Sequence, residues 1–176
     1  MRRLLLVLGL LATVGCGAAD PPSTSTPTRG GTVDPQAPTT AAEARSVIDK
    51  VAGGVVSPVD VSTFVTPSGI YCNLTDSNGA PLGCEPAKPT VEDTTYCAGA
   101  PTKRIGRIEL DAGVPKPVCN ADTIRSVDGA SLPYGQATTA AGHAMKCVNQ
   151  EIGVTCLATG GSRGFFLGTG GFLLLS

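Results

Sequence analysis

The residues best suited to chemistry in this chain of 176 residues are its seven cysteines and its single histidine, His143. Thiols in this number can form disulfides, bind a metal or catalyse thiol exchange. A metal site and thiol oxidoreductase activity are not expected, because no Cys-x-x-Cys pair occurs and one imidazole cannot complete a mixed Cys/His set. We therefore expect no metal and no other cofactor. The cysteines then divide into Cys16 and six disulfide-forming residues: Cys72, Cys84, Cys97, Cys119, Cys147 and Cys156.

The first fifteen residues have the pattern of an export signal. Arg2 and Arg3 give a cationic start, and the apolar run over residues 4–14 is shorter than the ~20 residues that a membrane-spanning helix needs. Residues 12–16, Ala-Thr-Val-Gly-Cys, resemble the bacterial lipobox, with Thr13 where leucine is usual. We expect residues 1–15 to be a lipoprotein signal peptide and Cys16 to carry diacylglycerol and a fatty acyl chain. The alternatives are an ordinary secretory signal with a chance cysteine and a twin-arginine signal.

Charge and lipidation together define the expected location and partners. The chain has 13 Lys and Arg against 14 Asp and Glu, and removal of the leader changes the net charge from −1 to −3. Nucleic-acid binding needs a basic surface, so this class of function is excluded. The two acyl chains of the diacylglycerol on Cys16 are already enough to hold a protein stably on a membrane without crossing it. We expect a lipid-anchored protein on the extracytoplasmic face of the cell membrane, with an unidentified envelope component or protein as its second partner.

Two segments precede the expected β domain. Residues 16–39 are rich in Pro, Ser, Thr and Gly and hold almost no apolar side chain, so they are expected to form a disordered linker. Residues 40–54 follow the pattern of one short amphipathic helix. Thr40 and Glu43 have the spacing of a capping box, apolar residues recur at helical intervals, and Gly53-Gly54 ends the run.

Residues 60–176 show short apolar runs separated by turn residues. The spacing of these runs and the high Gly and Pro content predict a mainly β fold, a small antiparallel sandwich or barrel held by disulfides. The expected strands are residues 63–66, 70–75, 82–85, 105–110, 134–138, 144–148, 154–158, 164–167 and 172–175.

Two predicted hairpins limit the pairing of the six cysteines, which otherwise have fifteen connectivities. The turn pair Asn78-Gly79 lies midway between the first two cysteines, and residues 144–148 and 154–158 place one cysteine on each strand of a second hairpin. The two remaining cysteines pair by elimination. An oxidising compartment outside the membrane favours these bonds. The expected disulfides are Cys72–Cys84, Cys97–Cys119 and Cys147–Cys156.

Several sequence blocks between residues 63 and 176 resemble those of an actinobacterial family of secreted or lipid-anchored proteins of unknown function. The blocks are Pro67-Ser68-Gly69-Ile70-Tyr71-Cys72, Cys84-Glu85-Pro86, Leu132-Pro133-Tyr134-Gly135, Gly153-Val154-Thr155-Cys156 and Gly164-Phe165. This chain lacks the family's Asn after Gly69 and has an insertion near residues 159–165. The resemblance implies a small disulfide-bonded β domain in the cell envelope, and it implies no ligand.

No group of residues in the sequence has the pattern of a catalytic site. His143 stands without a nucleophile motif or a phosphate-binding glycine loop, and we expect it to be structural or exposed to solvent. Two features could bind a ligand. The first is the basic group Lys103, Arg104, Arg107 and Lys116, which is either a solvated strand face or an anion site. The second is the Gly-rich stretch 160–171, where Phe165 and Phe166 either form a mobile loop or belong to the core.

These observations favour a membrane-anchored, extracytoplasmic, non-enzymatic module that binds an envelope component or a partner protein. The alternative from another class is an inhibitor of a hydrolase such as lysozyme. Ser68-Gly69-Ile70-Tyr71 resembles the Ser-Gly-x-x-Tyr loop of membrane-bound lysozyme inhibitors, with one residue fewer. A hydrolase centred on His143 is a third possibility.

Overall fold

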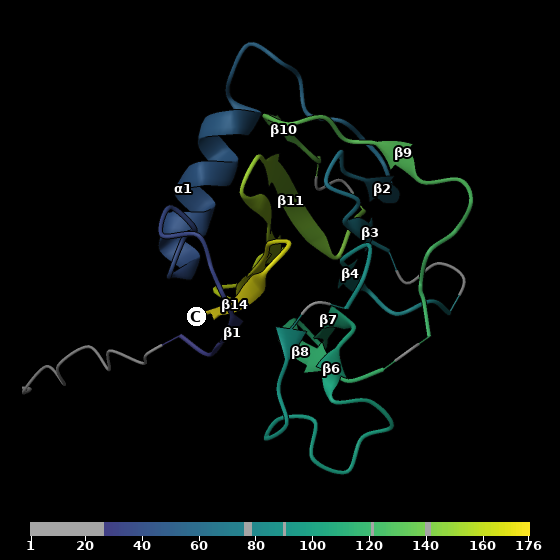
Figure 1. Cartoon of the computed structure of the whole chain (residues 1–176). Helices are drawn as coiled ribbons and strands as arrows, with labels where there is room; N and C mark the ends of the chain where they lie inside the picture. Colours follow the sequence, from purple (N-terminus) through teal and green to yellow (C-terminus); the bar gives the residue numbers. More distant parts are fainter. Residues whose placement is uncertain (1–26, 76–78, 90, 121, 140–141) are drawn as a thin grey trace, which may run out of the picture.

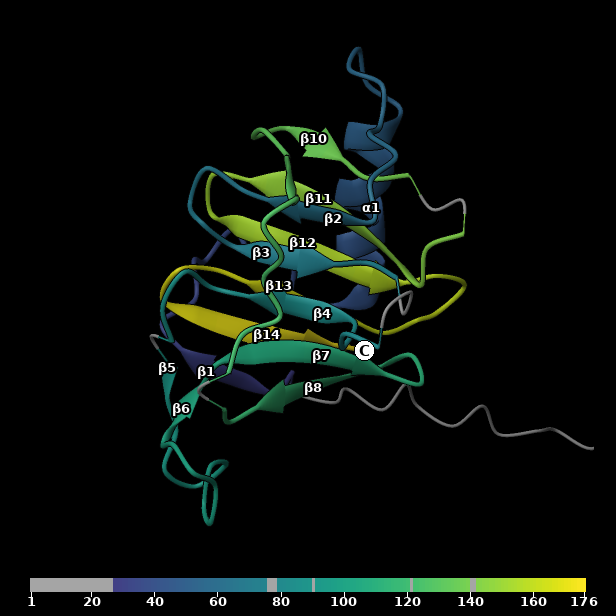
Figure 2. The same cartoon turned by 90° about the vertical axis from the view of Figure 1, so that its right-hand side faces the viewer.

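The structure, a computed structural model, describes residues 27–75, 79–89, 91–120, 122–139 and 142–176. Two six-stranded sheets lie face to face, and one helix covers the outer face of the first sheet (Figures 1 and 2). A small separate sheet pairs β5 (Val91–Glu92) with β6 (Arg104–Ile105). The expected mainly β fold is confirmed, and its architecture is a sandwich.

The first sheet has both of its faces buried. Its strand order is β1-β14-β13-β12-β11-β10, and every pair in it is antiparallel. Cys156 and Phe165 face the other sheet, whereas Leu157 and Phe166 pack toward the helix. Burial on both faces explains why these strands have nearly continuous apolar sequences. The strands are β1 (Arg29–Gly31), β10 (Gln136–Ala137), β11 (Met145–Gln150), β12 (Gly153–Ala158), β13 (Gly164–Leu167) and β14 (Gly171–Leu175).

The second sheet has the order β8-β7-β4-β3-β2-β9, and its β2/β9 pair is parallel. Phe64, Cys84 and Ile108 point into the sandwich and are fully buried. The residues that alternate with them lie on the outer face. The strands are β2 (Thr63–Val65), β3 (Tyr71–Asn73), β4 (Gly83–Glu85), β7 (Arg107–Asp111), β8 (Val114–Val118) and β9 (Ala130–Ser131).

Thr40 caps the N-terminus of helix α1 (Ala41–Ala52), and its hydroxyl accepts a hydrogen bond from the Glu43 amide at 3.2 Å. The Glu43 carboxylate accepts bonds from the amide and hydroxyl of Thr39, at 2.7 and 2.9 Å. Ala44 and Ile48 are buried against the first sheet. Within the described ranges, no helix has the length and apolar character needed to cross a bilayer.

Three disulfides join the cysteines in the sequential order expected: Cys72–Cys84, Cys97–Cys119 and Cys147–Cys156. The first and third link register partners on neighbouring antiparallel strands, with Cα atoms 4.1 Å apart. The second joins the loop after β5 to the end of β8. Asn78, which belongs to the expected hairpin turn, and residues 1–26 with Cys16 lie outside the described residues.

Three edge strands of the six-stranded sheets, β1, β8 and β9, lie outside the strands expected from the sequence. Residues 29–31, which fall in the expected linker, form β1 on the first sheet. This pairing depends on Gly30, because a Cβ atom at this position would lie 2.3 Å from the Phe172 ring. Residues 114–118 form β8 although Pro115 and Pro117 interrupt them, since a strand at an edge can contain prolines whose missing amides would face outward.

Candidate functional site

A chain segment without regular structure crosses the outer face of the second sheet. This crossing segment comprises residues 120–129, of which 121 is not described, and Figure 2 shows it in green running across the strands. The Cys97–Cys119 disulfide precedes it, and the Leu132 amide, which donates to the Val65 carbonyl, follows it. Polar and charged side chains that are rarely buried lie beneath this segment.

Glu85 and Arg125 form the centre of this buried polar layer. The Arg125 Nε lies 2.9 Å from Oε1 of Glu85, a residue that is only 4% exposed. The same carboxylate accepts bonds from the Thr123 hydroxyl at 2.5 Å and the Ile124 amide at 3.0 Å. Arg125 also donates to the Gly69 carbonyl at 2.6 Å. Both Glu85 oxygens thus have donors from the crossing segment, so the carboxylate holds this segment on the sheet.

Arg107 forms a second ionic group in the same layer. Its guanidinium contacts Glu109 at 2.5 Å and Asp122 at 3.3 Å. The Asn120 side-chain amide donates to Asp122 and, together with the Arg107 charge, holds the pKa of this carboxyl below its usual value. Within the described part of the chain, these charges bind one another. These paired charges link the crossing segment to the second sheet.

The basic residues singled out in the sequence do not form one exposed surface. Arg107 is buried in the layer just described. Lys103 donates to the Cys97 carbonyl at 3.5 Å, and Arg104 donates to the Pro89 carbonyl at 3.3 Å. Lys116 is exposed on β8. The structure places these cations at separate positions and gives most of them partners within the chain.

His143 connects two loops instead of facing a nucleophile. Its Nε2 lies 3.4 Å from the Asp60 carboxylate, and its Nδ1 lies 3.1 Å from the Thr139 carbonyl. The Thr159 hydroxyl donates to the backbone carbonyl of His143, so this hydroxyl is directed at the peptide group and not at the ring. The side chain is 8% exposed. This geometry ties the segment after α1 to the β10–β11 connection.

The other sequence candidates lie inside the molecule. Phe165 and Phe166, within the Gly-rich stretch, are 0% and 1% exposed and belong to the core. In the Ser68-Gly69-Ile70-Tyr71 block, Ile70 is fully buried and the Tyr71 hydroxyl bonds to Ser126 at 2.9 Å. These side chains are directed into the domain and not toward a partner.

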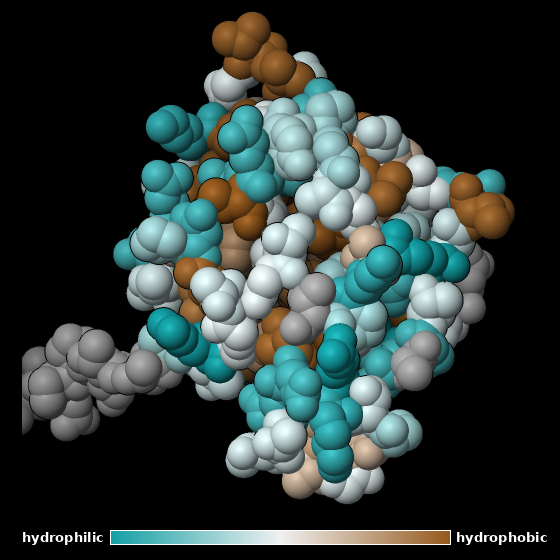
Figure 3. All heavy atoms as spheres, viewed as in Figure 1, coloured by the Kyte–Doolittle hydropathy of each residue, from teal (hydrophilic) through white to brown (hydrophobic). Residues whose placement is uncertain are grey.

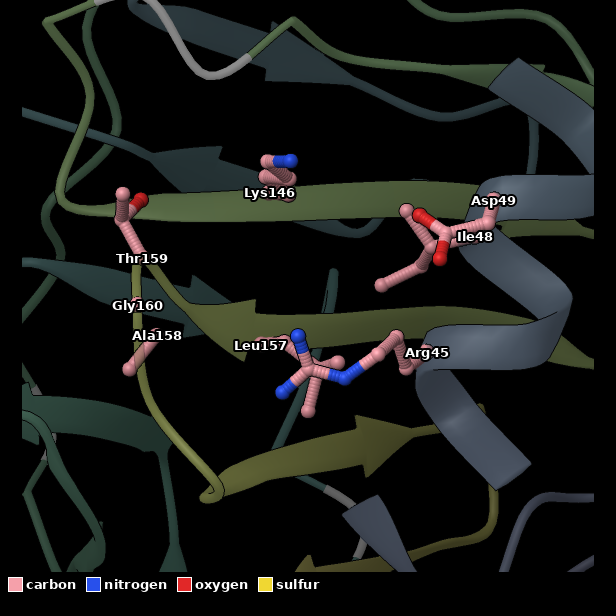
Figure 4. A pocket seen from close by; sticks show the side chains of 8 residues that line it. All are labelled: Arg45, Ile48, Asp49, Lys146, Leu157, Ala158, Thr159 and Gly160. Atoms are coloured by element: carbon pink, nitrogen blue, oxygen red, sulfur yellow. The ribbon is translucent and has the colours of Figure 1, made fainter. Parts of the chain in front are cut away.

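A small pocket lies between α1 and the turn after β12 (Figure 4). Arg45 and Asp49 project from the helix, while Lys146 projects from β11. The Arg45 guanidinium donates to the Gly161 carbonyl at 2.8 Å and closes one side. The space is about 40 Å³, which accommodates about one or two water molecules and not a drug-sized ligand.

The loop after α1 exposes two large apolar side chains. We call residues 53–57 the apolar loop; in it Val55 is fully exposed and Val56 is 50% exposed. The hydropathy surface shows an apolar projection at the top of the molecule, where this loop lies in Figure 1 (Figure 3). Tyr134, which is 41% exposed, belongs to the connection from β9 to β10, and Figure 1 shows this connection at the same end of the molecule. Two valines directly after Gly53-Gly54 are the sequence signal for this loop, because they follow the end of the helical pattern.

The base of the apolar loop is fixed to the sandwich. The Gly53 amide donates to the Asp49 carbonyl at 2.9 Å and terminates α1. Val59 forms a parallel bridge with Thr138 beside β10, with amide-to-carbonyl bonds of 2.9 and 3.0 Å on its two sides. The loop is therefore short and held at both ends.

No family model, no curated protein and no solved structure matches this chain.

Proposed function

We propose that this protein is a lipid-anchored, extracytoplasmic lipoprotein whose β sandwich binds a partner protein through the apolar loop. The exposure of Val55 and Val56 on a loop with a fixed base carries this proposal. Exposed aliphatic side chains at a projecting position are suited to an apolar depression on another protein. A loop that is already ordered loses little conformational entropy on binding.

The expected lipid anchor fits this use of the domain. Cys16 precedes the first described residue, Pro27, by a short stretch of ten residues. The chain enters the sandwich at β1, whereas Val59 fixes the apolar loop beside β10, and β1 and β10 are opposite edges of the first sheet. Anchoring at one edge leaves the loop at the other edge accessible to a partner.

Site-specific photo-cross-linking in whole cells tests the loop contact. A photoreactive amino acid at the exposed position Ser57 should give a discrete adduct, and the same probe at Asp128 on the crossing segment should not. The adduct should disappear in a Val55→Ser/Val56→Ser chain and remain in a Val127→Ser chain, since Val127 is 99% exposed elsewhere. An equal adduct pattern from both probe positions, or an adduct that survives the double substitution, contradicts the proposed contact.

Substitution of Cys16 tests the anchor independently. A Cys16→Ala chain should leave the membrane fraction, and the wild-type mass should exceed that of the processed polypeptide by the mass of the acyl groups. An unchanged membrane fraction for Cys16→Ala would refute lipidation.

The hydrolase-inhibitor alternative stays a prediction with its own test. The purified domain without its leader should inhibit lysozyme if this alternative holds. Because Ile70 and Tyr71 are buried, their side chains cannot enter an enzyme cleft, whereas Val55 and Val56 of the apolar loop are exposed and could. Absence of inhibition at high micromolar protein removes the alternative.

A further inference from the structure

A groove lies at the edge of the sandwich where the described chain begins. It has a volume of about 280 Å³, and its lining includes Pro27, Thr28, Val114, Pro115, Leu174 and Arg163. Val114 is 42% exposed at the start of β8. The Leu174 amide donates to the Thr28 carbonyl at 2.8 Å and fixes the beginning of the chain on this edge. In Figure 1 the C-terminus lies beside β1 and β14, at this same edge.

The length of chain before this groove limits its distance from Cys16. Ten residues lie between Cys16 and Pro27, and they span at most about 40 Å when fully extended. The opposite edge of the first sheet lies five strand spacings away, a distance of about 24 Å. The ten residues are therefore long enough for the groove to rest on the membrane that holds Cys16, and the choice between the two edges depends on their exposed side chains.

One cationic residue lines the groove, and two more are adjacent in sequence to residues that line it. Arg163 lines it, Arg29 follows Thr28, and Lys116 follows Pro115; all three cations are exposed. Within the described ranges, neither Arg29 nor Lys116 forms an ion pair.

Three acidic groups lie at the same edge. Asp111 and Glu109 are the register partners of Val114 and Lys116, and Ser176, which carries the last carboxylate of the chain, lines the groove. Glu109 is paired with the buried Arg107, so the three exposed cations outnumber the two other acids. Exposed cations next to an exposed apolar side chain are typical of a surface that contacts anionic lipid headgroups.

We propose that this edge, the anchor edge (Pro27, Thr28, Arg29, Val114, Lys116 and Arg163), rests on anionic phospholipid headgroups of the bilayer that holds Cys16. The inference rests on the proposed lipid anchor and adds an orientation to it. Val114 enters the headgroup region, and the cations lie beside the phosphates. The apolar loop then projects away from the membrane.

Tryptophan fluorescence tests this orientation directly, because the natural chain has no tryptophan. The lipidated full-length chain is reconstituted in vesicles of zwitterionic and anionic phospholipid that carry bromine on the acyl chains near the headgroup. Three separate variants place the reporter at different surfaces: Val114→Trp on the anchor edge, Val55→Trp on the apolar loop and Val127→Trp on the crossing segment. All three positions are exposed, so each variant should retain the fold, which circular dichroism checks.

The expected result is quenching of the Val114→Trp variant at least about twofold stronger than that of the other two. Adding Lys116→Gln and Arg163→Gln to the Val114→Trp chain should reduce the quenching in anionic vesicles toward the level in vesicles of zwitterionic lipid alone. Equal quenching of all three reporters, or strongest quenching at Val55→Trp, overturns the orientation. Sedimentation with the vesicles is measured in the same samples. If the chain sediments but the three reporters are quenched equally, the lipid anchor is supported and the proposed membrane contact of the anchor edge is refuted. If the chain is not lipidated, the proposed function itself is refuted.

Discussion

Cys84 and Cys156 bring their sulfur atoms to within 3.8 Å of each other, although the two residues belong to different sheets and different disulfides. All four cysteines of these two bridges are fully buried. Each bridge joins two strands within a sheet, and their contact lies between the sheets. The sulfur atoms thus occupy core volume that this chain, with four Phe and no Trp, does not fill with aromatic rings.

Removing a core bridge should cost more stability than removing the loop bridge. Each closed loop contributes about 3 kcal/mol in the loop-entropy model, and Cys97–Cys119 closes the longer loop. Cys72→Ala/Cys84→Ala removes two fully buried sulfurs beside Cys156, whereas Cys119 of the other bridge is only partly buried, so the additional void adds about 1 kcal/mol. Urea unfolding of the two double variants compares these losses. A larger loss for Cys97→Ala/Cys119→Ala would contradict this role for the core sulfurs.

Arg125→Ala should release the crossing segment. The substitution removes one of the donors to a buried carboxylate, Glu85, and we expect the free energy of unfolding to fall by about 1–3 kcal/mol. The Ile124 amide should exchange its hydrogen faster. Arg104→Ala is the matched control, because Arg104 is exposed and donates to a loop carbonyl. Similar losses for the two variants would show that the Glu85 contact contributes nothing particular.

Gly83→Ala should destabilise the second sheet. Gly83 has a φ of +150°, and a Cβ atom there would lie 2.2 Å from the Ile108 carbonyl oxygen on β7. We expect a loss of ~2–4 kcal/mol from backbone strain and overpacking. Gly99 also has a positive φ, +82°, but faces open space, so Gly99→Ala should cost only about 1 kcal/mol. Thermal unfolding of the two variants measures the difference, and equal losses would mean that the contact with β7 relaxes freely.

The start of α1 should weaken at acidic pH. Hydrogen bonds from the amide and hydroxyl of Thr39 lower the pKa of Glu43. A carboxyl whose pKa is lower in the folded state stabilises that state above its unfolded pKa, and this contribution is lost as the pH falls through the folded pKa. NMR chemical shifts of the Thr39 and Glu43 amides should follow this titration in the wild type. Glu43→Gln should remove the pH dependence; a titration that persists in Glu43→Gln arises from another group.

Local patterns predicted the parts of this fold in which the determining residues are close in sequence. Thr40 and Glu43 predict the start of the helix. One cysteine on each strand of a hairpin predicts the disulfide between the two strands. The segments that local patterns missed depend on distant partners. Residues 29–31 become a strand because β14 offers them an edge, and Arg125 contacts a carboxylate that lies 40 residues earlier in the chain. A single sequence records neither relationship.

The candidate site was accessible to sequence analysis only in part. The sequence pattern singles out the cations around residue 107, but Arg107 is buried and pairs with Glu109 and Asp122. Val55 and Val56 are not predicted as a site by their residue type, because valine is usually buried. Their exposure follows from Gly53-Gly54, which ends the helix before these valines could join its apolar face, and from Val59, which returns the chain to the sheet.

The two prolines of β8 affect how copies of this protein meet. The Val118 carbonyl accepts a hydrogen bond from the Gly106 amide. The backbone groups of positions 114, 116 and 118 therefore point toward β7, and the backbone groups of positions 115 and 117 point away from the sheet. The outward positions thus present carbonyl oxygens without amide hydrogens, and a second chain cannot extend the sheet there in a regular ladder. This margin resists edge-to-edge polymerisation, so crowding of many copies does not convert the sandwich into a fibre through β8.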